Sequence, residues 1–330
     1  MSRLWKVLLC GYYGMGNLGD ELLARASIAL LESCGVARGE MAMLSGCPEE
    51  SQEFHGIQAF DRWSPKSIFS AARQSDTFLL GGGGLFQDST SLRTPLYYWL
   101  AVKTARLAGC KVWAAGQSIG PLRRKISRAL ARNAFSSCRS VMVRDGHSRD
   151  FLGGRALLSE DLVLALPSSR SEKGGSRFLL NLRAWDGRLE YEAARAFSTL
   201  ALPEGTSVVG VAMDRGDARL MEKMDSDGQL RLDELVCPSL GQVPEVFRGG
   251  ASALGMRLHF GVLCMKSAIP CALIPYDPKV SAFARRWGAA LWNGGAMELP
   301  RPWERAPELL DAVESLKLNF HECFEKVLKG

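Results

Sequence analysis

Residues 7–21, VLLCGYYGMGNLGDE, predict a buried strand, a glycine-rich loop and the first turn of a helix. The run 7–10 is apolar, and the glycines that follow it allow the backbone to turn tightly. Beyond Glu21 the apolar residues recur at helical spacing as far as Leu31. A strand, a glycine loop and a helix in this order form the opening unit of a doubly wound parallel α/β sheet.

The same alternation continues along the chain. Further buried strands are expected at residues 41–44, 77–80, 111–115, 140–143, 178–183, 207–213 and 271–276. The segment 167–176 is polar and glycine-rich and predicts a linker. We therefore expect an α/β protein of two doubly wound Rossmann-like domains, residues 1–168 and 176–330, with a GT-B-like architecture and a cleft between the domains. A last helix over residues 307–328 is a candidate to pack back on the N-terminal domain.

The loop 14–19, GMGNLG, has the glycine spacing of a dinucleotide-binding fingerprint. That fingerprint also needs an acid at the end of the second strand, where residues 45–48 are SGCP. Asp20 and Glu21 would repel a pyrophosphate, whereas they suit the helix dipole and could bind sugar hydroxyls. We therefore expect Asn17 and Asp20 to face a sugar, the alternative being that they only cap the turn and the helix.

Two more loops follow expected strands, GGGGLFQD at 81–88 and GQSIGP at 116–121. Four consecutive glycines leave room for backbone N–H groups to approach a ligand closely. Because the carboxyl ends of parallel strands share one edge of a sheet, these loops are expected to extend the sugar-binding side. Its further expected residues are Gly83, Gly84, Asp88 and Gln117.

A second motif lies in the other half, GMRLHFG at 255–261 followed by YDPK at 276–279. Small residues at 251–255 predict a turn, and 257–266 predict a helix with Arg257 and His259 in its first turn. A helix N-terminus and a guanidinium both attract anions, and Lys279 is expected just past a strand end. The pattern predicts a site for an anion that needs a proton, the alternative being a satisfied histidine and two surface cations.

These stretches resemble motifs of the polysaccharide pyruvyl transferase family. The resemblance rests on GYYGMGNLGDE at 11–21, GGGGLFQD, GQSIGP, GMRLH at 255–259 and IPYDPKV at 274–280, in the expected order. The CsaB-like enzymes of this family attach ketal-linked pyruvate to cell-wall sugars. The resemblance therefore implies an enzyme with phosphoenolpyruvate as the donor and with no metal or redox cofactor.

The resemblance also implies roles for particular residues. The N-terminal domain becomes the acceptor side and the C-terminal domain the phosphoenolpyruvate side. His259 is the expected general acid, and Asp20 or Asp88 the group that accepts hydroxyl protons. The residues expected to bind phosphoenolpyruvate are Arg144, Arg257, Leu258, His259 and Lys279.

The implied acceptor is a cell-wall polymer that contains N-acetylmannosamine, free or lipid-linked, as used in S-layer anchoring. Two alternatives are open. One is a GT-B glycosyltransferase that uses a nucleotide sugar, and the other is a non-catalytic NAD- or sugar-binding module built on the first glycine loop.

Composition is typical of a soluble globular enzyme, with 47% hydrophobic and 23% charged residues. No apolar run is long enough to cross a membrane, and the first residues do not resemble a signal peptide, so a cytoplasmic protein is expected. The nine cysteines form no C-x-x-C pair and no His/Cys cluster, which indicates reduced thiols and no zinc site.

The net charge of +6 is modest, but five cations gather in the segment Arg123–Arg132. The interleaved apolar residues predict a basic amphipathic helix, which could contact anionic lipid at the inner face of the membrane. The alternative is a solvated helix face. No interleaved aromatic residues accompany this segment, and no nucleic-acid partner is expected.

Overall fold

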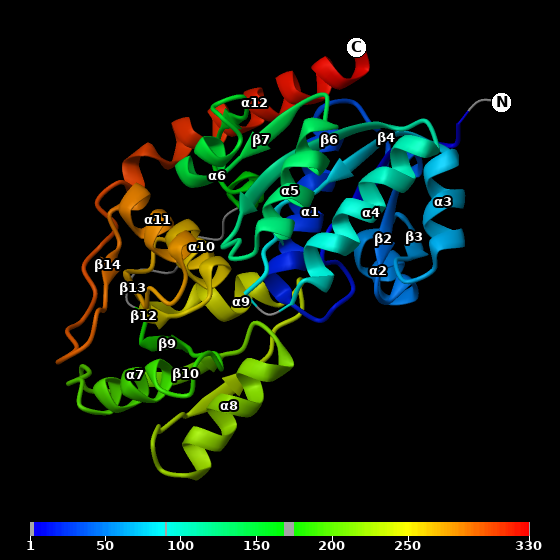
Figure 1. Cartoon of the computed structure of the whole chain (residues 1–330). Helices are drawn as coiled ribbons and strands as arrows, with labels where there is room; N and C mark the ends of the chain where they lie inside the picture. The colour runs from blue at the N-terminus through cyan, green and yellow to red at the C-terminus, as the bar shows by residue number, and fades with distance from the viewer. Residues whose placement is uncertain (1–2, 90, 168–174, 330) are drawn as a thin grey trace. The chain divides into compact units, whose positions relative to one another are not determined.

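The computed structural model describes residues 3–89, 91–167 and 175–329 (Figure 1). The chain forms two compact units. The first unit contains Met1–Met15, Asp20–Leu166 and Leu310–Gly330, and the second contains Gly16–Gly19 and Pro167–Leu309. The predicted linker at 167–176 falls mostly on residues 168–174, which lie outside the described residues.

Within the described residues, the first unit is built on an eight-stranded sheet in the order β3-β2-β1-β4-β6-β7-β8, with β5 paired to β6. Neighbouring strands are parallel, and Leu8 of the central strand lies opposite Ala42 and Phe78. The strands are β1 Trp5–Cys10, β2 Met41–Ser45, β3 Gln58–Asp61, β4 Ser75–Leu80, β5 Gly83–Phe86, β6 Lys111–Ile119, β7 Val141–Val143 and β8 Leu157–Leu158.

Helices connect these parallel strands, as parallel pairing requires. They are α1 Leu18–Ser33, α2 Pro48–His55, α3 Pro65–Arg73, α4 Arg93–Leu107, α5 Lys125–Ser136 and α6 Gly146–Phe151, with 3₁₀ turns at Arg38–Glu40 and Leu162–Ala165. Helix α12 Leu309–Lys329 follows the last strand of the chain and also belongs to this unit. Side chains alternate between the two faces of a strand. Val112 and Ala114 therefore pack in the core formed with α3, α4 and α5, whereas Trp113 contacts Phe320 and Phe324 of α12, at ring distances of 5.5 and 5.3 Å.

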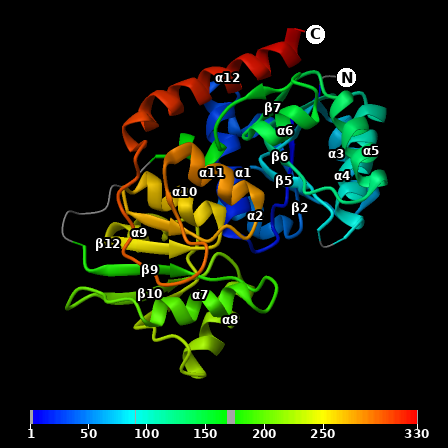
Figure 2. The ribbon, with the colours of Figure 1, turned by 60° about the vertical axis from the view of Figure 1, so that its left-hand side comes forward.

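The second unit is built on six parallel strands of the described chain, in the order β11-β10-β9-β12-β13-β14. Helices α7 and α8 lie on one face of this sheet, and α10 and α11 on the other (Figures 1 and 2). The strands are β9 Arg177–Asn181, β10 Ser207–Val211, β11 Glu234–Val236, β12 Gly250–Gly255, β13 Cys271–Leu273 and β14 Ala290–Leu291. The helices are α7 Leu189–Ser198, α8 Arg215–Ser226, α9 Val243–Arg248, α10 Leu258–Lys266 and α11 Pro278–Trp287, with a 3₁₀ turn at Ala306–Glu308.

Two parallel sheets with helices on both faces confirm the predicted pair of doubly wound α/β folds. No helix in the described part of the chain combines the length and the apolar composition that crossing a bilayer requires.

The prediction of a turn at 251–255 is wrong, because these residues belong to the central strand β12 between β9 and β13. Their small size serves close packing. A Cβ on Gly255 would lie 2.2 Å from the ring of Phe260, and one on Gly250 would lie 2.5 Å from Ile269. Small residues therefore mark a crowded strand here.

The two later glycine loops are also partly strand. Gly83 pairs with Gln117, and Phe86 pairs with Ile119, so β5 and the end of β6 extend the sheet where loops were expected. Leu85 and Phe86 are buried, which gives this glycine-rich strand a core contact.

Candidate functional site

His259 lies in the first turn of α10, as predicted, and this helix begins directly beyond the carboxyl end of β12. Arg257 is the N-cap residue of this helix, and Leu258 is buried at its start. His259 is partly exposed. A histidine at this place can present its imidazole to a ligand beyond the sheet edge.

The first glycine loop belongs to the same unit as His259 through its residues Gly16–Gly19. The Leu18 N–H donates to the Met213 carbonyl at 2.8 Å. A Cβ on Gly19 would lie 2.2 Å from His259 Nδ1 and 3.2 Å from Asn17 Oδ1. The structure thus brings together two motifs that lie about 240 residues apart in the sequence, and only glycine fits at position 19.

Arg257 is not an unpaired cation. Its Nε donates to Asp217 Oδ2 at 2.9 Å, and its Nη2 contacts Asp217 Oδ1 at 2.7 Å and also Asp214 Oδ2. The side chain is 15% exposed. Two carboxylates therefore surround one guanidinium, and sequence reasoning missed both of them.

The pKa values of this cluster are set by its burial and by the charges and hydrogen bonds within it. Burial raises the pKa of Asp217, against the opposing effect of Arg257. Burial would also raise the pKa of Asp214, but Arg257 and two backbone N–H donors lower it overall. The two carboxylates raise the pKa of Arg257 despite its burial, so the guanidinium stays charged.

Asn181 fixes the backbone where α10 begins. Its Oδ1 accepts the Arg257 N–H at 2.9 Å, and its Nδ2 donates to the Val211 carbonyl at 2.9 Å. Asn181 is fully buried at the end of β9. It therefore positions the helix that carries His259.

Lys279 lies in the first turn of α11, past the end of β13, as predicted. Its Nζ is 3.4 Å from Asp277 Oδ2, and its side chain is 30% exposed. Asp277 caps the helix by accepting the Lys279 N–H. Lys279 is thus a half-buried cation with one carboxylate neighbour.

An aromatic cluster at the same sheet edge was not predicted. The rings of Trp185 and Tyr276 lie 4.9 Å apart, and Arg183 Nη1 donates to the Tyr276 hydroxyl at 3.1 Å. The Arg183 guanidinium also lies 5.4 and 5.0 Å from the two ring centroids. Trp185 is 41% exposed, and its place just beyond strand β9 is the signal that could have identified it.

Arg144, in the first unit, is paired, and its side chain is 5% exposed. Its Nε donates to Ser118 Oγ at 2.8 Å, and its Nη1 pairs with Asp161. Asp161 also caps the 3₁₀ turn Leu162–Ala165. The neighbouring Asp145 caps α6 by accepting the Ser148 N–H. The structure supplies Asp161 as the ion-pair partner of Arg144.

The expected acceptor-side residues differ in their surroundings. Asp20 lies near the second glycine segment, because a Cβ on Gly83 would be 3.5 Å from Asp20 Oδ1. Gly83 has φ +118°, which requires glycine. Gln117 is buried within β6, where its Nε2 donates to the Gly81 carbonyl, and Gly84 lies in β5.

Asp88 has a structural role. Its two carboxylate oxygens accept the N–H groups of Arg123 and Arg124, at 2.7 and 2.8 Å, just before α5. The side chain is 2% exposed. Of the two expected bases, this geometry favours Asp20.

Glu21 holds the first glycine loop from within the first unit. One of its oxygens accepts the Gly14 N–H at 2.8 Å, and the other lies 2.8 Å from His55 Nε2. The Gly14 N–H is therefore bound to a carboxylate, whose negative charge would repel a dinucleotide phosphate in this loop. Among the described residues, no group of three His, Cys, Asp or Glu side chains is placed to hold a metal ion.

Residues 17–278 match the family described as polysaccharide pyruvyl transferase. The chain belongs to the polysaccharide pyruvyl transferase family. The matched segment includes Asn17, Arg144 and His259 and ends one residue before Lys279. As a polysaccharide pyruvyl transferase, the protein is an enzyme. A comparison with curated protein sequences found no significant match.

The fold of this pyruvyl transferase is similar to that of nucleotide-sugar epimerases. UDP-GlcNAc 2-epimerase from Methanocaldococcus jannaschii, in complex with UDP-GlcNAc and UDP, is 10% identical over 98% of this chain and 100% of that chain, with a TM-score of 0.58. The Neisseria meningitidis enzyme bound to UDP-GlcNAc is 10% identical over 98% and 100% of the two chains, with a TM-score of 0.55. Likeness at this identity shows the fold alone, and it confirms the GT-B-like prediction.

Proposed function

We propose that the protein transfers the pyruvyl group of phosphoenolpyruvate to two hydroxyls of a sugar in a cell-wall or surface polysaccharide, forming a cyclic ketal and releasing phosphate. Family membership supports the reaction class. The observation that carries the proposal is the place of His259, in the first turn of α10 and against the Gly16–Gly19 loop.

In the proposed reaction, His259 protonates the methylene carbon of phosphoenolpyruvate, which leaves a cation at C2. One sugar hydroxyl bonds to C2 and passes its proton to Asp20. The bond from C2 to the phosphate oxygen then breaks, and the leaving phosphate takes up the proton from Asp20. The second hydroxyl closes the ketal, and its proton restores His259. One donor and one diol thus give one ketal and one inorganic phosphate, with no redox step.

The donor carries a carboxylate and a phosphate, so it needs cations around it. Nε and Nη2 of Arg257 are bound to Asp214 and Asp217, whereas the hydrogen bonds of this side chain to described residues do not involve Nη1. We assign this Nη1 and the Lys279 ammonium to the donor, with buried Leu258 supporting the helix start. The part of Arg144 rests on the family resemblance.

The test is a paired measurement on the full chain. Phosphoenolpyruvate binding is measured by isothermal titration calorimetry, and turnover by phosphate release with a sugar acceptor. His259→Asn should keep donor affinity within a few-fold and lower turnover by about 10²–10⁴. The control is His321→Asn, at an exposed histidine on α12, which should leave both unchanged. Undiminished turnover in His259→Asn would contradict the assignment.

The alternatives are tested in the same titrations. Binding of a UDP-sugar in place of phosphoenolpyruvate would favour the glycosyltransferase, an alternative suggested by the epimerase-like fold. Binding of NAD would favour the non-catalytic NAD- or sugar-binding module. The hydrogen bond from the Gly14 N–H to Glu21 argues against a phosphate in the first glycine loop.

The proposed acceptor is an N-acetylmannosamine-containing, lipid-linked glycan, met at the inner face of the membrane. Helix α5 supports this part of the proposal. The side chains of Arg123, Lys125 and Arg128 are exposed, and Ile126 is 55% exposed beside them. Such a face suits an anionic bilayer surface. Comparing a free with a lipid-linked disaccharide as acceptor tests it, and equal turnover would contradict the lipid-linked choice.

A further inference from the structure

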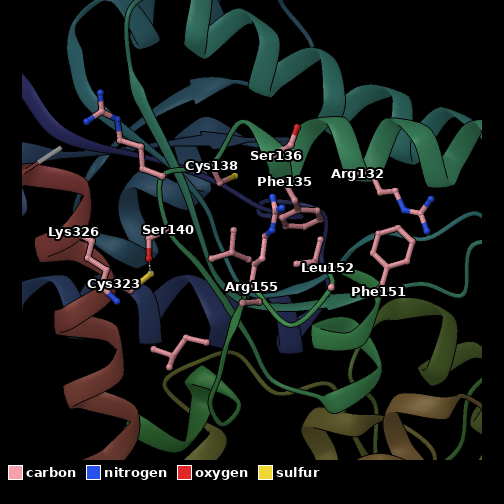
Figure 3. A pocket seen from close by; sticks show the side chains of 15 residues that line it. Arg132, Phe135, Ser136, Cys138, Ser140, Phe151, Leu152, Arg155, Cys323 and Lys326 are labelled. Atoms are coloured by element: carbon pink, nitrogen blue, oxygen red, sulfur yellow. Dashed lines mark hydrogen bonds between the residues drawn. The ribbon is translucent and has the colours of Figure 1, made fainter.

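A cavity of about 650 Å³ lies in the first unit, and none of the residues that line it is assigned above to catalysis or donor binding (Figure 3). Its walls come from the end of α5, the segment leading into β7, the connection from α6 to β8, and α12. These segments all belong to one compact unit, so the cavity is complete within it.

The lining of this cavity is strongly cationic. It contains Arg132, Arg139, Arg155 and Lys326, and no carboxylate is among the residues that line it. Lys326 pairs with Glu322 at 2.5 Å, outside the lining, and the Arg132 guanidinium lies 5.2 Å from the ring centroid of Phe151. Arg139 and Arg155 form no ion pair with any described residue. Cations gathered without acids favour an anion between them.

The rest of the lining is mostly apolar or neutral. Phe135, Phe151 and Leu152 are its large apolar side chains, and Figure 3 shows Arg155 extending from the connection between α6 and β8 toward Phe135. Burial raises the pKa of the Cys323 thiol to about 11 and raises that of Cys138 well above its usual value. Both thiols therefore stay neutral and do not oppose an anion.

We infer that this cavity binds a phosphate ester whose organic part is apolar. The guanidinium groups of Arg139 and Arg155 suit a phosphate, because each can donate two parallel hydrogen bonds to its oxygens. The aromatic and aliphatic wall would cover the apolar part. The same chemistry is presented by a soluble phosphate ester and by a phospholipid headgroup with the first part of its chain.

The probes are inorganic phosphate and hexyl phosphate, titrated calorimetrically into the full chain. Hexyl phosphate should bind saturably and more tightly than inorganic phosphate, because it also uses the apolar wall. The double variant Arg139→Gln/Arg155→Gln should lower the affinity for hexyl phosphate by about tenfold or more. Its matched control is Arg73→Gln/Arg231→Gln, which changes the net charge equally at exposed positions elsewhere and should bind as the parent does.

A sedimentation assay separates the two sources. Vesicles of phosphatidylcholine, alone or with equimolar phosphatidylglycerol, are mixed with parent and variants. Binding that needs phosphatidylglycerol, is lost in Arg139→Gln/Arg155→Gln and is displaced by hexyl phosphate identifies a lipid headgroup. Hexyl phosphate binding without vesicle binding identifies a soluble ester.

Two results would overturn the inference. One is the absence of saturable hexyl phosphate binding to the parent protein. The other is an equal loss of binding in the cavity variant and in its control. Lys326→Gln gives an independent check. It alters another wall of the cavity and should also lower the affinity for hexyl phosphate. Because Arg139 and Arg155 are exposed, the variant Arg139→Gln/Arg155→Gln should unfold at the same thermal midpoint as the parent protein.

Discussion

Asp88 accepts two backbone N–H groups at the start of α5, and this use of a carboxylate leads to a prediction at the scale of one residue. Asp88→Asn keeps only one good acceptor. It should lower the free energy of unfolding by about 1–2 kcal/mol at neutral pH, measured by urea denaturation. Asp150→Asn, at an exposed position on α6, is the control and should change stability by less than about 0.5 kcal/mol.

The effect of Asp88 should depend on pH. Burial alone would raise its pKa, but the N–H groups of Arg123 and Arg124 lower it below the usual 3.8. The unfolded chain therefore binds this proton more readily than the folded chain. The stabilisation is fully present above the unfolded pKa and is lost as the pH falls through the folded pKa. The difference in the free energy of unfolding between the parent and Asp88→Asn should thus shrink on acidification below about pH 4. A difference that stays constant with pH would contradict this account.

Individual residues also show which parts of the site could be predicted from the sequence and which could not. The first-turn position of His259 follows from local pattern, and the structure confirms it. The partners of Arg257 do not, because Asp217 lies 40 residues away and meets it only through the parallel crossovers of the sheet. Sequence spacing gives no measure of such a contact.

At the scale of an element, strand β12 is held close to α10 by its small residues. Gly255→Ala would place a methyl group 2.2 Å from Phe260, which must then shift within α10. We expect a loss of about 1–3 kcal/mol in the free energy of unfolding. Gly241→Ala is the control, since nothing lies within 4 Å of a Cβ there. Equal stability of the two variants in urea denaturation would contradict the packing argument.

Elements with a strong apolar pattern were predictable, and weakly patterned ones were not. Strands β1, β2 and β4 are apolar runs that end in glycine or serine, and their positions follow from the sequence. Helix α8 escaped prediction because it is mostly polar and buries few apolar side chains, among them Met221 and Met224. Strand β12 escaped because alanine and glycine indicate a turn as readily as a crowded strand.

At the scale of the whole molecule, α12 completes the first unit although it follows the second in sequence. Phe320 is fully buried against Trp113 of β6. Phe320→Ala should lower the free energy of unfolding by about 3–5 kcal/mol. Leu318→Ala, at a side chain that is 71% exposed, is the control and should change it by less than about 0.5 kcal/mol. Chemical denaturation followed by tryptophan fluorescence measures both, and a mild effect of Phe320→Ala would contradict the docking.

The two-unit α/β architecture was predictable because strand and helix patterns alternate twice around a polar linker. The membership of Gly16–Gly19 in the second unit was not, since that segment lies between β1 and the body of α1, both in the first unit. Such contacts join residues that lie far apart in the sequence, and local periodicity carries no information about them.

The docking of α12 also sets an order of events during synthesis. Domains generally fold from the N-terminus as the chain emerges. Here Trp113 must wait for residues more than 200 positions later, so the face of the first sheet that α12 covers stays open to water until residues 309–329 leave the ribosome. The second unit can fold in the meantime. A nascent chain of this protein therefore exposes an apolar surface while the second unit is translated, and such a surface is what a ribosome-associated chaperone binds.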